Sequence, residues 1–308
     1  MLKSRLLFIL FLFTAAASCF AQGYHVGRTV IDVPDESKKT GMLELHIYYP
    51  SSDEGYDVPL APGEELFPVL VFGHGYRMPV KYYENLWSAL VPEGYIMILP
   101  ASGLEMFPSH MDFGIDLLKA ASFMQAKNND PASLFYRRIG AGTCLMGHSM
   151  GGGSAILGAS ESDIVDAMVL LAPYNTKPSS IEAAGNLTIP VLVLAGSNDC
   201  VTSPRKHAFP IYESFRSNCR TYVEIIGGTH CNMAIKNKLC SLAERTKPEN
   251  LIPREEQHRI LKRFILPWLN YMLKGEEMAS SEFDRLLESD KAVNFKRSLP
   301  LGSVTPVK

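Results

Sequence analysis

The sequence predicts a doubly wound α/β domain, in which helices cover both faces of a mostly parallel β-sheet. Short apolar runs recur along the chain, and stretches of helical length separate them. Strands inside a parallel sheet are buried on both faces, so they are apolar throughout. Right-handed crossovers between such strands then place helices on both faces of the sheet.

The predicted elements follow one another in a regular order. Residues 43–49 alternate apolar and polar side chains, which is typical of a half-buried edge strand. The expected buried strands are residues 68–72, 95–99, 139–146, 167–171, 191–195 and 222–226, the last of these being the final strand. The expected helices are residues 82–90, 113–127, 154–159, 204–216 and 255–273. Residues 51–65 are expected to form a surface loop, and the tail after Asn294 is expected to be irregular.

The first 21 residues have the features of a secretory signal peptide. Lys3 and Arg5 precede an uncharged apolar core, and small residues lie where a signal peptidase reads the chain. The core is short for a membrane span, which needs about 20 residues. We expect cleavage after Ala21 and a secreted or periplasmic protein. An uncleaved anchor and a lipoprotein acylated at Cys19 are the alternatives.

Residues 22–308 are predicted to form one domain, since their length is usual for a single large α/β domain. The formal charge of the whole chain is −2 at pH 7, and no basic stripe is visible. We therefore expect no nucleic-acid partner. No second long apolar segment follows residue 21, so stable membrane insertion of the mature protein is not expected.

Export changes how the cysteines are interpreted. Cys144 lies inside an apolar run and is predicted to be a buried thiol, whereas Cys200, Cys219, Cys231 and Cys240 lie in loop-like sequence. An oxidising compartment would allow two disulfides among these four. A short loop favours Cys231 with Cys240, which leaves Cys200 with Cys219 by elimination, although a helix length could separate that pair. The chain has no Cys-x-x-Cys pair, so zinc is not expected. No residue is assigned as a metal ligand, and bound calcium is left open.

The stretch Gly147-His-Ser-Met-Gly151 follows the apolar run 139–146 and precedes a helical stretch. This Gly-x-Ser-x-Gly pattern is typical of a tight strand-to-helix turn that lifts a serine hydroxyl above the sheet. The two glycines leave room where side chains would clash. Ser149 is therefore the candidate nucleophile, and the alternative is an ordinary serine in a glycine-rich loop.

A serine hydroxyl needs a base to remove its proton, and the base needs an orienting acid. On this type of sheet the order along the chain is serine, acid, histidine, each just beyond a strand end. Asp199 follows the strand 191–195, and His230 follows the strand 222–226. Asp166 precedes its strand, and the other histidines precede the acid or fall in predicted helices. The alternatives are an ordinary turn aspartate and a surface-loop histidine.

The oxyanion of a tetrahedral intermediate needs hydrogen-bond donors. One donor is expected to be the backbone N–H of Met150, directly after the nucleophile. The other is expected to be the N–H of Tyr76, because Gly73 and Gly75 allow the backbone to approach a substrate closely. His74, between these glycines, is interpreted as a loop-packing residue rather than as a proton carrier.

With these motifs, the chain resembles the α/β-hydrolase family, and within it the secreted bacterial cutinases and polyester hydrolases of the dienelactone-hydrolase-like group. The resemblance runs from about Arg28 to Lys274 and is strongest in residues 69–76, 147–154, 171–174 and 190–230. A dienelactone hydrolase proper uses a cysteine nucleophile, and the serine here disfavours that activity. The cysteines are also offset from the disulfide of the plastic-degrading members.

The resemblance implies further substrate contacts. Tyr174, in Leu-Ala-Pro-Tyr, matches an aromatic residue that lies against the acyl ring, and Val201 matches an aliphatic residue of the same cleft. We also count His148, next to Ser149, as a candidate substrate contact. No lid insertion is visible, so the cleft is expected to be shallow and open.

The motifs and the resemblance together predict a secreted serine carboxylic-ester hydrolase that acts through an acyl-enzyme and needs no cofactor. Its expected substrates are short-chain or aromatic esters, with polyester fragments as a further candidate, and the protein is expected to be a monomer. Three alternatives remain: a secreted peptidase or amidase with the same triad, a lipase with a hydrophobic lid, and a non-catalytic binding relative of the fold.

Overall fold

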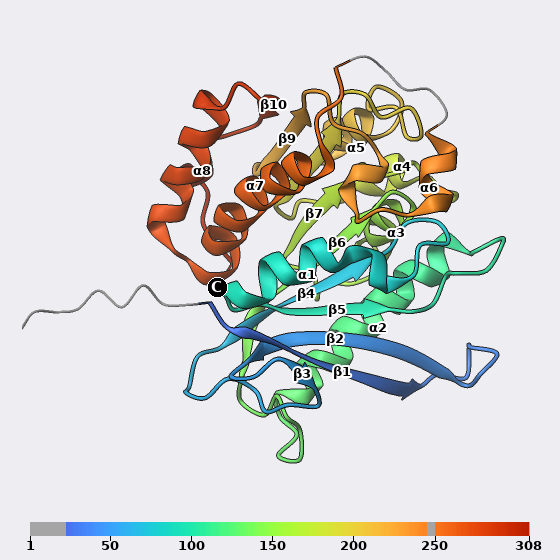
Figure 1. The fold of residues 1–308 in the computed structure, drawn as a ribbon, viewed down its shortest axis with the longest axis vertical. Helices are drawn as coiled ribbons and strands as arrows, with labels where there is room; N and C mark the ends of the chain where they lie inside the picture. Colours follow the sequence, from blue (N-terminus) through green and yellow to red (C-terminus); the bar gives the residue numbers. More distant parts are fainter. Residues whose placement is uncertain (1–22, 245–249, 308) are drawn as a thin grey trace, which may run out of the picture.

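The computed structural model describes residues 23–244 and 250–307, so the signal peptide predicted for residues 1–21 lies outside the described residues. The described chain contains a ten-stranded sheet with the order β10-β9-β8-β7-β6-β4-β5-β2-β1-β3 (Figure 1). Its parallel strands are β4 (Phe67–Gly73), β5 (Ile96–Pro100), β6 (Ile139–His148), β7 (Ala167–Leu171), β8 (Val191–Gly196) and β9 (Arg220–Ile225). The predicted α/β-hydrolase fold class is confirmed.

The parallel strands separate two hydrophobic cores. Along β4, Leu70 and Phe72 belong to one core, whereas Val69 and Val71 belong to the other. Successive side chains of a strand point to opposite faces, so an apolar strand contributes to both cores. This explains why β4, β5, β7 and β8 carry no polar side chains and why the sequence predicted them.

Helices cover each face of the sheet. The first core is covered by α1 (Glu84–Leu90), α7 (Arg254–Lys274) and α8 (Glu277–Ser289). The second is covered by α2 (His110–Lys127), α3 (Met150–Ala159), α4 (Ser180–Ala184) and α5 (Ala208–Ser214). A short helix, α6 (Lys238–Ala243), lies between β9 and α7 along the chain. None of the helices in the described ranges has both the length and the hydrophobicity needed to cross a membrane.

The two edges of the sheet differ from the prediction. The half-buried strand predicted at one edge is β2 (Met42–Ser51), which is internal because the antiparallel β1 (His25–Pro34) pairs with it. β3 (Gly55–Tyr56) then pairs with β1 inside the expected surface loop. At the other edge, β10 (Val293–Arg297) pairs antiparallel with β9. Residues 222–226 are therefore not the last strand, and the tail after Asn294 is not wholly irregular.

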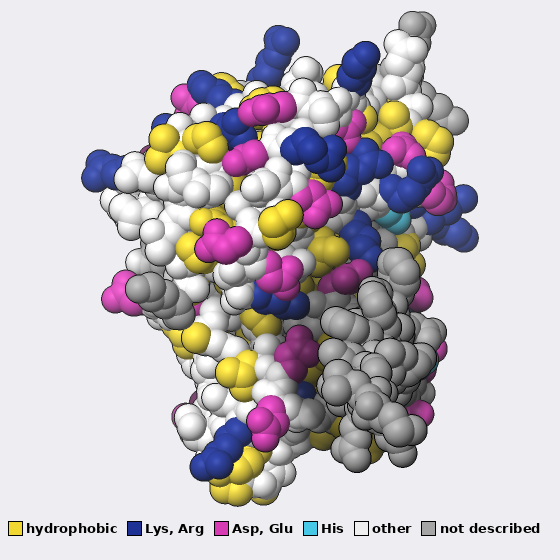
Figure 2. Space-filling view, turned by 90° about the vertical axis from the view of Figure 1, so that its left-hand side faces the viewer, with side chains coloured by type: hydrophobic (Ala, Val, Ile, Leu, Met, Phe, Trp, Pro, Cys, Tyr) yellow, Lys and Arg dark blue, Asp and Glu magenta, His cyan; other side chains and the backbone are white. Residues whose placement is uncertain are grey.

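Some helices also differ from the prediction. The helix predicted over residues 204–216 is limited to α5, and the preceding residues form turns. α2 begins at His110 because the Ser109 side chain accepts a hydrogen bond from Asp112 N and caps the helix. Figure 2 shows the face at the left of Figure 1, where hydrophobic side chains lie scattered among charged ones.

Candidate active site

Ser149 lies at the sharp turn between β6 and α3. Its backbone has φ 56° and ψ −120°, a conformation that costs energy for a residue with a Cβ atom. The surrounding backbone holds this turn, because Ser149 N donates to Leu171 O at 2.9 Å and Tyr174 N donates to Ser149 O at 2.9 Å. The strained turn places the serine just beyond the carboxyl end of a central strand.

The two glycines of the turn allow it to pack tightly. A Cβ atom on Gly147 would lie 2.4 Å from the Gly151 carbonyl, and one on Gly151 would lie 2.1 Å from Gly73 O. Both distances are far inside van der Waals contact. Glycine is therefore required at both positions, for the reason that the sequence suggested.

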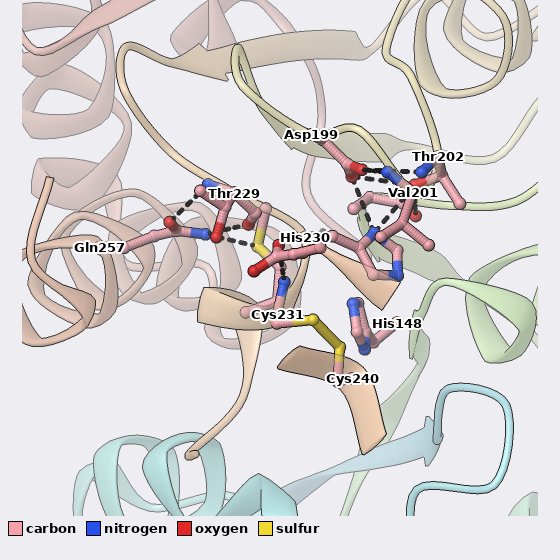
Figure 3. A network of polar contacts seen from close by, with 12 residues as sticks. His148, Asp199, Val201, Thr202, Thr229, His230, Cys231, Cys240 and Gln257 are labelled. Carbon is pink, nitrogen blue, oxygen red and sulfur yellow. Dashed lines mark hydrogen bonds and ion pairs between the residues drawn. A yellow bond between two sulfur atoms is a disulfide. The ribbon is translucent and has the colours of Figure 1, made fainter. Parts of the chain in front are cut away.

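Asp199 follows β8 and is almost fully buried. Its Oδ1 accepts hydrogen bonds from the backbone N–H groups of Val201 at 2.8 Å and Thr202 at 2.7 Å. Its Oδ2 accepts from Thr202 Oγ1 at 2.9 Å and is 2.7 Å from His230 Nδ1 (Figure 3). Four partners thus fix the position of this carboxylate.

His230 follows β9, and its ring is held between Asp199 and the ring of His148, whose centroid is 4.5 Å away. An ionised carboxylate can only accept hydrogen bonds, so His230 Nδ1 must carry the proton that it donates. In the neutral ring Nε2 is then unprotonated and can accept a proton. Among the hydrogen bonds of the described residues, none joins the Ser149 hydroxyl to His230. Catalytic hydrogen bonds are often longer when no substrate is bound.

Two residues that support this pair were missed by the sequence analysis. Thr202 bonds to Asp199 through both its N–H and its hydroxyl, and its Oγ1 is also 3.0 Å from His230 Nδ1. Gln257, fully buried on α7, accepts from Thr229 N and donates to Thr229 O, each at 2.9 Å. It thereby fixes the backbone next to His230. The Asp-x-x-Thr spacing was an available signal for Thr202, because such side chains often bond to the backbone of their own turn.

His148 is fully buried, which contradicts its prediction as a substrate contact. Its Nδ1 accepts a hydrogen bond from the Tyr83 hydroxyl at 3.0 Å, and Tyr83 in turn accepts from Gly75 N at 2.7 Å. Burial lowers the pKa of His148 well below its usual value, and the nearby His230 lowers it further. His148 is thus a neutral residue that joins the serine turn to the Gly73–Tyr76 loop.

His74 is also buried, with Nδ1 2.9 Å from Gly75 O and Nε2 2.7 Å from Ser102 O. Its ring packs 4.7 Å from the ring of Phe113, centroid to centroid. Burial lowers the pKa of His74. These contacts agree with its interpretation as a loop-packing residue.

The remaining predicted site residues lie just beyond the carboxyl ends of the parallel strands. Tyr76 follows β4, Met150 follows β6, Tyr174 follows β7, and Val201 follows β8. Because these strands are parallel, their carboxyl ends lie on the same side of the sheet, which is where ligands bind in such folds. Tyr76 is nearly half exposed, and the ring of Tyr174 lies 5.0 Å from that of His207.

Comparison with known proteins agrees with this arrangement. Residues 96–246 match a family model described as PETase, PET hydrolase-like. The chain has the α/β-hydrolase fold and is similar to the cutinase and polyester hydrolase group within it. The matched segment of this α/β-hydrolase contains Ser149, Asp199 and His230.

Curated relatives include cutinases and one terephthalate ester hydrolase. Cutinase 1 of Thermobifida cellulosilytica is 32% identical over 96 residues, which cover 31% of this chain and 35% of the cutinase. Bis(hydroxyethyl) terephthalate hydrolase of Streptomyces coelicolor is 25% identical over 192 residues, which cover 62% of this chain and 56% of that protein. The α/β-hydrolase thus spans about a third to just over half the length of these relatives.

The α/β-hydrolase has a disulfide between Cys231 and Cys240, which confirms the favoured pair (Figure 3). The second predicted pair is wrong, because Cys200 and Cys219 are free thiols. Cys200 follows β8 and Cys219 precedes β9, so these two residues lie at opposite ends of parallel strands. Cys144 is buried as predicted, and burial raises the pKa of its thiol.

Within residues 23–244 and 250–307, no group of three or more His, Cys, Asp or Glu side chains is arranged to hold a metal ion.

The burial of His148 predicts a pH dependence of stability. The unfolded chain protonates this histidine below about pH 6.5, whereas the folded α/β-hydrolase keeps it neutral between Tyr83 and His230. The free energy of unfolding should therefore fall as the pH drops below about 6.5, by up to about 1.4 kcal/mol per pH unit from this residue. His148→Asn, whose amide oxygen can accept from Tyr83, should reduce that slope in urea titrations between about pH 5 and 7.

A matched control is available at the surface. His25 is exposed at the start of β1, so His25→Asn should leave the slope unchanged. An unaltered slope in His148→Asn would show that His148 takes up its proton equally in both states.

Proposed function

We propose that this protein is a secreted serine ester hydrolase that acts through an acyl-enzyme on short-chain or aromatic carboxylic esters. The observation that carries the proposal is the buried Asp199–His230 pair beside a serine in a strained strand-to-helix turn. The relatives named cutinase and terephthalate hydrolase support ester hydrolysis. The predicted signal peptide and the Cys231–Cys240 disulfide support export to an oxidising compartment.

The proposed first step is the transfer of the Ser149 proton to His230 Nε2 as the serine oxygen attacks the ester carbonyl. Asp199 keeps the other proton on Nδ1 and stabilises the imidazolium that forms. His230 then gives this proton to the oxygen of the departing alcohol, and loss of the alcohol leaves an acyl group on Ser149. Water, activated by the same histidine, then releases the carboxylic acid and restores the serine.

The proposed oxyanion donors are the backbone N–H groups of Met150 and Tyr76. Met150 is the first residue of α3, and N–H groups in the first turn of a helix have no partner within the helix. Tyr76 N–H makes no hydrogen bond to any part of the chain that the structure describes. Its neighbour Gly75 is held by Tyr83, which fixes the direction of this loop.

The proposed substrate class follows from the residues around the serine. Tyr174 and Val201 are both partly exposed and come from loops after neighbouring strands, so an acyl group would lie between an aromatic ring and an aliphatic side chain. This favours flat or short acyl groups over long chains. A peptidase, a lipase and a non-catalytic relative are the alternatives.

A panel of chromogenic esters tests this function. Acetyl to hexanoyl esters should be cleaved faster than palmitoyl esters, and esters faster than anilides of the same acid. Faster cleavage of palmitoyl esters would favour a lipase. Faster cleavage of anilides would favour an amidase, and no turnover of any substrate would favour a binding protein.

Tyr174→Ala should lower kcat/KM for benzoyl esters by an amount equivalent to about 1–2 kcal/mol of binding free energy, the size of one aromatic contact. It should lower kcat/KM for acetyl esters much less. Tyr174→Phe is the matched control, because it keeps the ring and its packing against His207. The measurement is kcat/KM for both substrates. Equal losses on benzoyl and acetyl esters in Tyr174→Ala would show that the ring serves only packing.

A further inference from the structure

A pocket of about 450 Å³ is formed by residues that follow Tyr76 and His230 along the chain, and it is lined by four cationic side chains. We call it the cationic pocket, and its cations are Arg77, Lys81, Lys236 and Lys238. All four are exposed, and no acidic side chain is among the residues that line the pocket. The rest of its wall includes the less polar side chains of Pro79, Tyr82 and Leu239.

The residues that line the cationic pocket come from two segments, 77–82 and 236–239, which follow the proposed catalytic groups along the chain. Arg77 directly follows Tyr76, the proposed oxyanion donor, and Lys236 lies in the segment that follows His230. Ile235 N donates to Tyr82 O at 2.9 Å, and Asn85 Nδ2 donates to Met233 O at 3.1 Å. These hydrogen bonds join the two segments of the chain that line the pocket. Figure 1 shows α6 close to the start of α1.

What distinguishes the cationic pocket is that four cations line one hollow with no acidic side chain among its lining residues. Single cations without an ion pair, such as Lys39 and Lys291, also occur elsewhere in the described chain. None of the four pocket cations is ion-paired within the part of the chain that the structure describes, although the whole chain is slightly acidic. Like charges gathered in one place repel one another and attract anions.

The backbone of Arg77 gives a second indication. Its φ is 53°, in the left-handed region that a residue with a long side chain rarely adopts. Such conformations concentrate at functional sites, where the surrounding structure maintains them. Here the strained residue is the one that links the proposed oxyanion loop to the pocket, and its guanidinium can bind a carboxylate through two hydrogen bonds.

We propose that the cationic pocket binds a carboxylate group of the substrate, so that the enzyme prefers esters carrying a free carboxylate remote from the bond that is cleaved. Half-esters of aromatic diacids are the favoured class, because Tyr82 and Leu239 provide a surface for the ring beside the cations. This inference rests on the proposed ester hydrolase function. It adds a preference for anionic esters over neutral ones.

The first test compares anionic and neutral esters of the same shape. One pair is para-acetoxybenzoate and para-acetoxybenzamide, with the charge on the leaving group. The other is monomethyl terephthalate and its para-carbamoyl analogue, with the charge on the acyl group. The readout is the ratio of kcat/KM for the anionic ester to kcat/KM for the neutral ester. Both values depend in the same way on the concentration of folded enzyme, so a partial loss of folded enzyme does not change the ratio.

The double variant Lys236→Gln/Lys238→Gln should lower this ratio about 3- to 10-fold for at least one pair, mainly through KM, as expected for two exposed ion pairs. Lys291→Gln is the control, because Lys291 is exposed near β10 and outside the pocket. It should leave both ratios unchanged. Unchanged ratios in the double variant would overturn the inference, while continued turnover of the neutral esters would leave the proposed function intact.

The second test measures binding without turnover. Terephthalate should bind the Ser149→Ala variant in calorimetry, and adding Lys236→Gln/Lys238→Gln should weaken that binding about 3- to 10-fold. Inorganic phosphate at the same ionic strength should bind more weakly than terephthalate, because it cannot use the apolar wall. Phosphate binding as tight as terephthalate binding, or terephthalate binding that is independent of the two lysines, would overturn the inference even if no ester is cleaved.

Discussion

Ser149→Ala is expected to lower kcat on short-chain esters by on the order of 10⁴–10⁶-fold, the loss typical of removing the serine from a catalytic triad. The substitution removes only the hydroxyl oxygen. Alanine has the same Cβ atom, so it meets the same strain at φ 56° that serine meets. The surrounding bonds from Ser149 N to Leu171 O and from Tyr174 N to Ser149 O involve only backbone and remain possible. Unfolding by urea should therefore begin at nearly the same concentration as in the wild type.

The same helix offers a matched control. Ser154 is fully buried in α3, and its hydroxyl has no hydrogen-bond partner among the described residues. Ser154→Ala should retain turnover within a few-fold, because this serine lies one helical turn beyond the strained position. The measurement is initial-rate hydrolysis of an acetyl ester by both variants, after contaminating esterases have been excluded. Substantial activity of Ser149→Ala would assign the nucleophile to another residue.

The parallel core of the sheet was predictable because most of its strands are apolar runs. The missed strand β10 lacks such a pattern. Only Val293 of β10 is buried, so this strand is defined by its pairing with β9 rather than by its own hydrophobicity. A strand of this kind depends on contacts with a distant segment, which local periodicity does not contain. α8 differs, because it buries Ala279, Phe283 and Leu287 at four-residue spacing, so its helical pattern was available in the sequence and was missed.

The same distinction applies to the candidate site. The positions of Asp199 and His230 follow from a rule about strand ends, and strand ends were visible in the sequence. Gln257 was not predictable, because its role comes from the packing of α7 against the turn that contains Thr229. His148 was predicted as a substrate contact from its place next to Ser149. Its side chain instead lies below the surface, against Tyr83 and His230.

Asp199→Asn is expected to lower kcat by on the order of 10⁴-fold while the protein stays folded. The asparagine oxygen can still accept hydrogen bonds from Val201 N and Thr202 N, which now hold Oδ1 of the aspartate. The amide nitrogen would then occupy the place of Oδ2, 2.7 Å from His230 Nδ1. Because that nitrogen donates, it favours the tautomer in which Nδ1 is unprotonated and Nε2 carries the proton. His230 could then no longer accept the proton of Ser149, and the negative charge that stabilises the imidazolium would also be lost.

The control for this change is Asp166→Asn. Asp166 Oδ2 accepts a hydrogen bond from Thr143 N at 2.8 Å. Asp166 precedes β7, so it lies at the amino ends of the parallel strands, whereas Asp199 lies at their carboxyl ends. Burial raises the pKa of Asp166, so a neutral asparagine should be tolerated there with little change in kcat. Steady-state kinetics on one acetyl ester would compare the two variants, and nitrogen NMR of the imidazole would report which ring nitrogen of His230 is protonated. If Asp199→Asn kept kcat within about tenfold of the wild type, or if Nδ1 remained protonated, Asp199 would not be the residue that orients the base.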